Sequence, residues 1–236
     1  MRIHERIQRK NSRLRWRSLP KKLELTGKEQ KYKALAEKIG KTPVLFTGSF
    51  QSTSLYNYFT GNESSTLGSL NVKKTQFDIW QREQNYFGKR VFVEKPNTPR
   101  SQKIIDENNI NFNGFYVEHF QTPNRLKIEF ELPSEQLKDN QIIPITIYNP
   151  TKNVVNFNHP EIPVTITAVF LAHRETTDIP TEIEKMPTVL KPGESFKTQI
   201  KINTQNLKAG DYNFGITTNC ILGNAYNSKF VKATVN

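Results

Sequence analysis

Two alternating runs stand in residues 126–150, which read LKIEFELPSEQLKDNQIIPITIYNP. Apolar and polar side chains alternate over 126–132, and isoleucines alternate with other residues over 142–148 before Asn149 and Pro150 end the run. Alternation with a period of two is typical of a β-strand that buries one face. This stretch therefore predicts two neighbouring strands that cover an apolar core.

The same alternation continues to the C-terminus. Further runs occur at 164–171, 196–202, 212–217 and 230–235, with turn residues between them. Short strands at this spacing are typical of a sandwich, so we predict an immunoglobulin-like antiparallel β-sandwich domain over 115–236. Tyr212 follows the turn Ala209-Gly210-Asp211, and we expect its hydroxyl to bond a nearby backbone group.

Residues 24–114 follow a different rhythm. Thr26 and Glu29 match a capping box, and Gly40 is placed to end the helix that follows. The pattern then predicts a strand over 42–48, a helix over 49–59, a strand, turn and short helix over 69–80, and a strand over 89–94. We therefore predict a small three-layer α/β domain with a short, mainly parallel sheet, which makes the whole chain α+β.

Length and composition are those of a folded protein with two domains. The chain has 236 residues, of which 35% are hydrophobic and 24% charged. Its single cysteine, Cys220, excludes an intramolecular disulfide and a cysteine-based zinc site, and we expect it to be a buried apolar side chain. There is no apolar run of about 18 residues, and no export signal is recognised.

The net charge of +12 is concentrated in the basic arm, residues 1–23. Residues 1–22 hold nine Lys or Arg and one Glu, which is +8 of the +12. Such an arm can be a solvated tail, a contact with lipid headgroups or a contact with nucleic acid. Trp16 between two arginines favours a membrane surface, and we predict contacts there for Arg13, Arg15, Trp16 and Arg17. No nucleic-acid partner is expected, because the rest of the chain has little excess charge.

The sequence predicts no catalytic residue, no metal site and no cofactor. The histidines at positions 4, 119, 159 and 173 are not at ligand spacing, and the usual glycine-rich phosphate motifs are absent. Gly48-Ser49-Phe50 leads from a strand into a helix, where an anion site or a nucleophile elbow can lie. Gln51 replaces the second glycine of the elbow, so a simple helix start is the favoured interpretation.

Four carboxylates in the first half are candidates for an acid–base pair, although an exposed surface position is favoured for each: Glu63, Asp78, Glu83 and Glu94. The stretch Asn62-Glu63-Ser64 matches an N-glycosylation acceptor, which we interpret as accidental.

Five segments of the first half carry a resemblance to a known family: VLFTGSFQ at 44–51, SLYNYFTG at 54–61, LN at 70–71, QFDIW at 76–80 and FGKRV at 87–91. They resemble the soluble C-terminal region of bacterial membrane glycosyltransferases of family 39, which are similar to dolichyl-phosphate-mannose protein mannosyltransferases and aminoarabinose transferases. The family pattern has tyrosine where Phe50 stands, and it has the aromatic pair Tyr58-Phe59 in the opposite order.

The resemblance implies an extracytoplasmic (periplasmic), membrane-proximal, non-catalytic accessory region that serves stability or acceptor recognition. The catalytic acids of the family lie in the membrane portion, outside this chain. The implied partners are that membrane-embedded portion, anionic lipid headgroups and a glycan. Five residues are the candidate binding residues: Ser49, Gln51, Tyr56, Tyr58 and Trp80.

Two other hypotheses stay open at this point. One is a stand-alone carbohydrate- or protein-binding module in which Tyr56, Tyr58, Trp80 and Tyr86 form a stacking platform, although helix-face spacing favours burial of Tyr56. The other is a hydrolase with a site near Ser49 and Asp78.

Overall fold

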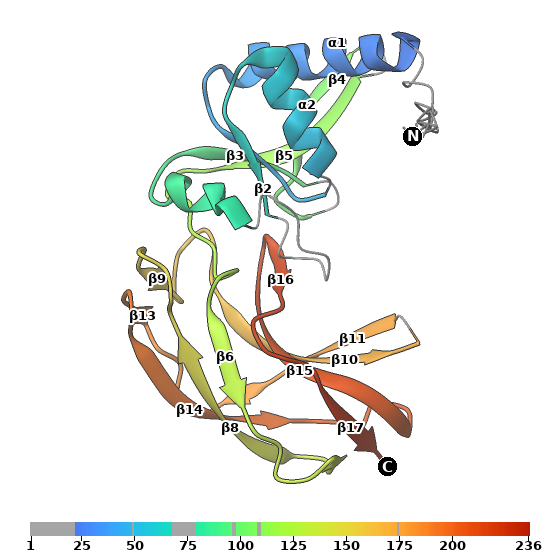
Figure 1. Ribbon diagram of the computed structural model, residues 1–236, viewed down its shortest axis with the longest axis vertical. Helices are drawn as coiled ribbons and strands as arrows, with labels where there is room; N and C mark the ends of the chain where they lie inside the picture. Colours follow the sequence, from blue (N-terminus) through green and yellow to red (C-terminus); the bar gives the residue numbers. More distant parts are fainter. Residues whose placement is uncertain (1–21, 49, 68–78, 96–97, 108–109, 174) are drawn as a thin grey trace, which may run out of the picture.

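The computed structural model describes residues 22–48, 50–67, 79–95, 98–107, 110–173 and 175–236. Two helices and a mixed sheet lie at one end of the molecule, and a larger β-sandwich lies at the other (Figure 1). Strands outnumber helices in the described part of the chain, so that part is mostly β and the predicted α+β class is wrong. No described helix has the length and the apolar character that crossing a membrane requires.

The first sheet has five strands in the order β2-β1-β3-β5-β4. Its elements are β1 (Val44–Phe46), β2 (Ser64–Thr66), β3 (Val91–Glu94), β4 (Gln102–Glu107) and β5 (Ile110–Val117). Strand β1 is parallel to β2 and β3, whereas β5 is antiparallel to both β3 and β4. A short 3₁₀ helix, η2 (Arg82–Tyr86), precedes β3.

Helices α1 (Lys22–Ile39) and α2 (Phe50–Thr60) pack together on one face of this sheet. Helix α1 begins four residues before Thr26 and ends at Gly40, which has a φ of +65° and donates its N–H to Ala36. Inward-facing residues of both helices bury against alternate residues of β1, β3 and β5 in one cluster: Tyr32, Leu35, Ile39, Val44, Phe46, Tyr56, Phe92 and Phe112.

The expected three-layer α/β domain with a mainly parallel sheet is therefore wrong. Only β2, β1 and β3 run parallel, and a β4–β5 hairpin completes the sheet in the antiparallel sense. No described helix covers the second face, because the apolar residues on that face pack against the sandwich instead: Leu45, Val91, Val93, Phe115 and Val117. Strands buried on both faces look the same in sequence whether a helix or a sheet covers them.

The sandwich consists of two main sheets. The smaller has the order β12-β14-β8-β6, formed by β12 (Glu182–Ile183), β14 (Ser195–Ile202), β8 (Gln141–Tyr148) and β6 (Lys127–Phe130). The larger has the order β11-β10-β15-β17-β7, formed by β11 (Glu175–Pro180), β10 (Thr165–Ala172), β15 (Gly210–Cys220), β17 (Val231–Val235) and β7 (Gln136–Leu137). Strand β16 (Gly223–Ala225) pairs with β15, and β9 (Val155–Asn156) pairs with β13 (Val189–Leu190).

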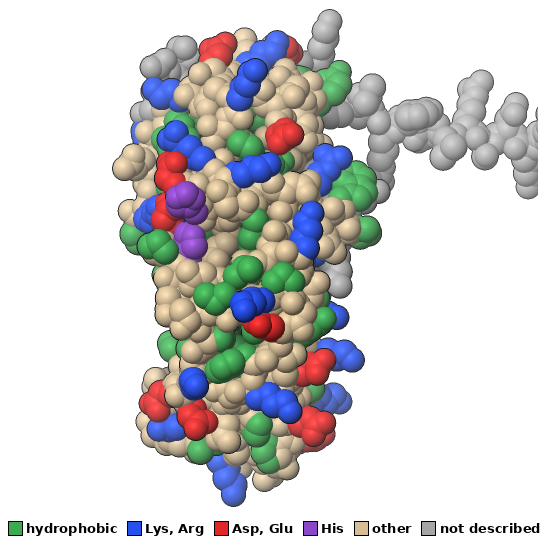
Figure 2. All heavy atoms as spheres, turned by 90° about the vertical axis from the view of Figure 1, so that its left-hand side faces the viewer, with side chains coloured by type: hydrophobic (Ala, Val, Ile, Leu, Met, Phe, Trp, Pro, Cys, Tyr) green, Lys and Arg blue, Asp and Glu red, His purple; other side chains and the backbone are tan. Residues whose placement is uncertain are grey.

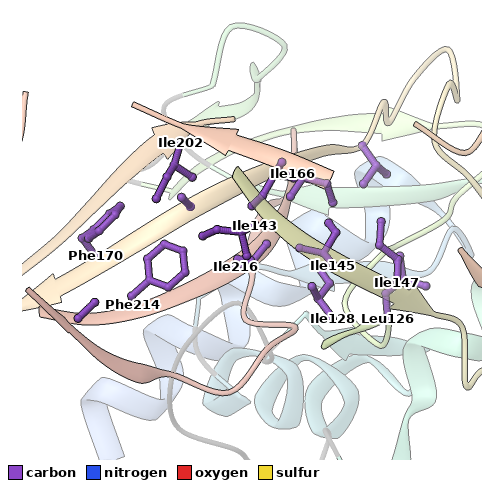
Figure 3. Packing of buried hydrophobic residues seen from close by; sticks show 14 of the residues in the cluster. Leu126, Ile128, Ile143, Ile145, Ile147, Ile166, Phe170, Ile202, Phe214 and Ile216 are labelled. Carbon is purple, nitrogen blue, oxygen red and sulfur yellow. The ribbon is translucent and has the colours of Figure 1, made fainter. Parts of the chain in front are cut away.

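The core of the sandwich lies between these two sheets (Figure 3). Isoleucines of β8 and β14 face phenylalanines and isoleucines of β10 and β15, as the alternating pattern requires. Phe214 packs edge-on against Phe130, with ring centroids 5.4 Å apart. The six alternating runs of the sequence all form strands here, so the predicted β-sandwich is confirmed. An immunoglobulin-like relationship stays a prediction.

The expected tyrosine hydrogen bond is present. The Tyr212 hydroxyl donates to the carbonyl oxygen of Lys208 at 2.8 Å, four residues upstream. Tyr212 also packs edge-on against Phe170 of β10, with ring centroids 5.6 Å apart. The residue thus ties the turn before β15 to the body of the larger sheet.

The junction between the two parts is an apolar core with polar bonds around it. Phe120, Ile162 and Leu222 bury against the second face of the first sheet. At the rim, Arg125 donates to the carboxylate of Glu83 at 2.7 Å, and the Glu83 side chain is only 2% exposed. Long-range contacts of this kind place the helical end and the sandwich in one packed unit.

A second group of polar bonds at the junction is centred on Glu161. Its carboxylate accepts the backbone N–H groups of Glu118 at 3.0 Å and His119 at 3.2 Å, and Arg100 donates to its carbonyl oxygen at 2.8 Å. Burial alone would raise the pKa of Glu161, but the two backbone N–H bonds and the Arg100 guanidinium, 3.4 Å from Oε1, outweigh it and the pKa is lowered. Histidines lie among acidic and basic side chains on the face that Figure 2 shows.

Cys220 is partly buried beside the junction core, in keeping with its predicted apolar role. Burial raises the pKa of its thiol to about 11, while backbone hydrogen bonds and Lys95 oppose the rise. The Lys95 ammonium donates to the carbonyl oxygen of Ile221 at 2.6 Å, and its own pKa is lowered by burial. The thiol is therefore an unreactive neighbour of a structural lysine.

Candidate functional site

The candidate site lies at the carboxyl edge of the three parallel strands. Strands β1, β2 and β3 end at Phe46, Thr66 and Glu94, and helix α2 begins at Phe50 soon after β1. In sheets with parallel strands, ligands bind beyond the carboxyl ends, where loops and helix N-termini converge. This edge is therefore where the fold offers a binding position.

The backbone at this edge is fixed by hydrogen bonds. Thr47 donates both its N–H, at 3.3 Å, and its hydroxyl, at 2.9 Å, to the carbonyl oxygen of Glu94. On the other side of β1, Leu67 donates its N–H to the carbonyl oxygen of Phe46 at 3.1 Å. These bonds continue the parallel ladder past the last paired residues. They fix the position of the backbone where the first turn after β1 begins.

Glu94 is the acidic group of this edge. It is the register partner of Phe46, so its side chain lies on the face that the helices cover. The side chain is half-buried, and burial raises the pKa of Glu94 while the positive charge of Lys31 on α1 lowers it. A carboxyl with a raised pKa near an ammonium group is suited to hold a proton or to accept a polar ligand.

Tyr32 and Ser52 complete the group around Glu94. Burial raises the pKa of Tyr32, a hydrogen bond with Ser52 lowers it and the charge of Glu94 raises it. The ring of Tyr32 packs edge-on against Phe46 and Tyr56, with centroids 6.1 Å away in both cases. The aromatic rings thus form an apolar floor beneath a small set of polar groups, which is the usual composition of a ligand site.

Lys31 is positioned by an aromatic ring as well as by charge. Its ammonium lies 4.5 Å from the centroid of the Phe112 ring, in cation–π contact. Phe112 belongs to β5, so the hairpin missed by the sequence analysis supports a residue of the site. The described residues contain no group of three or more potential metal ligands of the His, Cys, Asp and Glu types.

Of the predicted binding residues, Gln51 lies at this edge. Gln51 is exposed in the first turn of α2, whereas Ser49 lies outside the described residues. The strand-to-helix transition that the sequence indicated at Gly48 is present, with β1 ending at Phe46 and α2 beginning at Phe50.

The other three predicted binding residues are dispersed. Tyr56 is fully buried in the helical layer, so its ring is not at the surface. Tyr58 is 81% exposed on the outer side of α2, and Trp80 is 53% exposed with the Arg82 guanidinium 5.0 Å from its ring. Tyr86, the fourth ring of the suggested stacking platform, is buried.

Arg13, Arg15, Trp16, Arg17 and Asp78 lie outside the described residues. Glu83 is paired with Arg125, and Glu63 is exposed ahead of β2, so neither shares the carboxyl edge with Glu94.

Sequence analysis missed Thr47, Lys31 and Ser52 as site residues. The one usable signal was the position of Glu94, an acidic residue directly after the apolar run Val91-Phe92-Val93. Lys31 had no such signal, because one lysine of α1 looks like any other until the sheet beneath it is known.

A separate groove of about 1240 Å³ lies on the sandwich, along β6, β8, β14 and residues 227–231. Its charged residues are balanced in sign: Lys127, Lys197 and Lys229 against Glu129, Glu131 and Glu184. Because its positive and negative charges balance, this groove favours neither an anionic nor a cationic ligand. The carboxyl edge therefore remains the better-defined site.

Comparison with known proteins identifies no family. No protein-family model matches the chain, and no curated protein matches it. Among solved structures, β-glucosidase from Listeria innocua is 11% identical over 61% of this chain and 20% of that chain, with a TM-score of 0.30. The same enzyme in complex with isofagomine is 10% identical over 88% of this chain and 33% of that chain, with a TM-score of 0.31.

A chaperone–tip adhesion subunit pre-assembly complex, CsuC–CsuE from Acinetobacter baumannii, is 13% identical over 45% of this chain and 53% of that chain, with a TM-score of 0.21. The present chain thus spans between a fifth and about half of the length of these chains. Similarities of this size do not bear on its function.

Proposed function

We propose that this chain is a non-catalytic, extracytoplasmic accessory region of a membrane glycosyltransferase that uses a lipid-linked sugar, and that it contributes to acceptor recognition or to the stability of the enzyme. The catalytic acids of such an enzyme lie outside this chain. The proposal starts from the resemblance of five segments in the first half to the C-terminal region of family 39 enzymes.

The observation that carries the proposal is the meeting of three of those segments in one sheet and the helix that packs on it. Segment 44–51 supplies β1, Thr47 and the start of α2, segment 54–61 supplies the rest of α2, and segment 87–91 leads into β3. Strands β1 and β3 are direct neighbours, with Phe46 opposite Glu94. Segments that resemble one family and also pack together in one structural unit support the resemblance.

The charge distribution supports a position near anionic lipid. Lysines 28, 33 and 38 of α1 are exposed, and α1 lies at the end of the molecule away from the sandwich (Figure 1). The basic arm precedes this helix in the chain and holds +8 of the net charge. Basic residues near a membrane surface each contribute about 1 kcal/mol of attraction to anionic lipid. The helical end is therefore the end we expect to face the membrane.

The first test examines the coding region adjacent to the one that encodes this chain. We expect it to encode several apolar segments of about 20 residues, as a multi-spanning transferase requires. In that transferase, deletion of residues 24–236 should lower kcat/KM for the acceptor at least tenfold at equal amounts of enzyme, or else lower the amount of folded enzyme in the membrane. Hydrolysis of the lipid-linked donor by the enzyme that remains should be unchanged.

A matched variant separates the candidate edge from a general effect of deletion. Glu94→Gln should reduce acceptor transfer, whereas Glu135→Gln, at an exposed position of the sandwich, should not. A deletion that leaves both acceptor transfer and enzyme amount unchanged would refute the proposed function.

A further inference from the structure

A second hollow lies at the opposite, amino-terminal edge of the parallel strands. It has a volume of about 380 Å³. One wall comes from the end of α2 and the segment that enters β2, and the other from η2 and the segment that enters β3. Its size falls at the lower end of the range for small-molecule sites, which fits a ligand of one ring rather than an extended chain.

The side chains that line this pocket are almost all polar. Three are amides, Asn57, Asn62 and Asn85, and three are charged, Glu63, Arg82 and Lys89. Amides both donate and accept hydrogen bonds, the carboxylate only accepts, and the two cations only donate. The pocket therefore offers hydrogen-bond donors and acceptors together within a small volume.

The floor of the pocket is held by hydrogen bonds within the protein. Ser64 is 2% exposed, and its hydroxyl lies 2.6 Å from Oδ1 of Asn57 and 3.2 Å from the carbonyl oxygen of Thr53. Asn62 donates its side-chain amide to the carbonyl oxygen of Gly40 at 3.3 Å. These bonds hold two of the three amides in place before a ligand arrives, which reduces the ordering cost of binding.

Tyr86 adds a phenol to the floor. The residue is 5% exposed, and burial raises the pKa of Tyr86 to about 12, with Glu63 raising it further and Arg82 lowering it. The phenol therefore stays protonated at neutral pH and retains its donor.

Trp80 is next to the pocket in the fold, beside the lining residue Arg82, without being a lining residue itself. Arg82, which lines the pocket, lies 5.0 Å from the ring of Trp80, and the indole is 53% exposed. The part of the indole that Arg82 leaves open is the surface on which the apolar face of a ligand can stack.

We infer that this pocket binds one uncharged hexose unit of a glycan. A hexose presents several hydroxyls, each a donor and an acceptor, and its ring has an apolar face of C–H groups. An apolar ligand would displace water from the polar side chains that line the pocket without replacing its hydrogen bonds, at a cost for each. A phosphate would be attracted by Arg82 and Lys89 and opposed by Glu63, so the experiment includes phosphate as a competitor. A hard divalent cation would find only one carboxylate among the lining residues.

This inference stands on the pocket and does not require the chain to work beside a transferase. It also differs from a stacking platform of four rings, because only Trp80 is offered as a stacking surface. Sugar binding and acceptor transfer can therefore fail separately in the two experiments.

The test uses the full chain with Trp16→Phe, so that Trp80 is the only tryptophan. Methyl α- and β-hexosides of gluco, manno and galacto configuration are titrated, with saturation-transfer NMR on the sugar and indole fluorescence as the two readouts. We expect saturable binding of at least one hexoside with a Kd in the millimolar range. Arg82→Ala and Asn85→Ala should each weaken binding at least tenfold by NMR, whereas Asn111→Ala, at an exposed amide on β5, should not.

Thermal unfolding of each variant confirms that it is folded, since both altered side chains are exposed. Three results would overturn the inference. One is the absence of saturable binding for every hexoside, and another is binding that is equal in the Arg82→Ala, Asn85→Ala and Asn111→Ala proteins. The third is competition by inorganic phosphate at lower concentration than by any hexoside, which would indicate an anion site.

Discussion

Glu94 lies where a carboxylate is costly to the folded state. Its neighbours on the helical face are aromatic, and Lys31 offsets only part of the cost of burial, so its pKa is raised in the fold. A carboxyl whose pKa is higher in the folded than in the unfolded state stabilises the fold below its unfolded pKa. That contribution is lost as pH rises through the folded value. Residues kept at such a cost are typical of functional sites.

Glu94→Gln should therefore stabilise the protein at neutral pH. The amide has no charge to bury, so the free energy of unfolding at pH 7 should increase, and the gain should shrink as pH falls through the folded pKa of Glu94 toward about 4.3, the usual pKa of Glu. Urea unfolding of both proteins at pH 7, 6, 5 and 4 measures this difference.

The exposed Glu135→Gln variant provides the comparison, and its stability should match the parent within about 0.5 kcal/mol at pH 7. A Glu94→Gln protein that is less stable than the parent at pH 7 would show that the Lys31–Glu94 attraction outweighs burial.

Strand β5 shows how much an element depends on one small residue. A Cβ added at Gly114 would lie 2.3 Å from the carbonyl oxygen of Val93 and 2.4 Å from the ring of Phe92. The ring therefore occupies the space that a side chain at position 114 would need. Packing of β3 against β5 requires glycine here for reasons of space rather than backbone conformation.

Gly114→Ala should destabilise the protein by about 1–3 kcal/mol, the usual cost of overpacking, or more if the ring of Phe92 cannot shift. The same chemical change at Gly27, inside α1 with no atom within 4 Å of the added carbon, should stabilise it by about 0.5–1 kcal/mol. Urea unfolding reports both values. Equal effects of the two substitutions would show that the Phe92 ring moves aside at little cost.

The elements of the sandwich were predictable because several main strands bury one face and alternate, while β10 and the middle of β15 are continuous buried runs between turn residues. Strand β8, with its isoleucines on one side, is the clearest case. Strand β5 also alternates in part, but it lies at the end of the stretch whose pattern predicts an α/β domain. Its partner β4 has only two apolar residues, which are adjacent and do not alternate. The layer order could not be predicted from β1 and β3, because the covering of each face is decided by residues far away in the chain.

The candidate site was predictable only in part for the same reason. The loop between β1 and α2 has a local signal, namely an apolar run, a glycine and a helix start. Lys31 and Phe112 come from elements on either side of it in the chain and meet only in the fold. Burial of Tyr56 followed from its helix-face spacing, whereas the exposure of Trp80 had no local signal.

At the scale of the whole molecule, the ion pair of Arg125 and Glu83 links the two parts. The residues are 42 positions apart in the chain, and their side chains are 17% and 2% exposed. Removal of one partner of a buried pair leaves an uncompensated charge, which costs far more than the loss of a surface pair. The junction should therefore be sensitive to this single arginine.

Arg125→Ala should lower the free energy of unfolding by about 3–5 kcal/mol, measured by urea unfolding at pH 7. Lys201→Ala breaks a pair of similar length, 2.9 Å to Glu182, whose side chains are 40% and 78% exposed, and should cost less than about 1 kcal/mol. Addition of Glu83→Gln to Arg125→Ala should restore part of the loss. If Arg125→Ala and Lys201→Ala lower the free energy of unfolding by the same amount, the Glu83 carboxylate is hydrated in the folded protein.

The segment that joins the two parts is itself paired. Gly88 donates its N–H to Phe120 at 2.8 Å, and Phe120 donates its N–H to Lys89 at 3.0 Å, directly after β5 ends. A protease that acts on extended, accessible backbone finds no such stretch there, so digestion should not release two intact halves. Each half produced alone would also present to water the apolar side chains that the other half now covers, and would tend to aggregate.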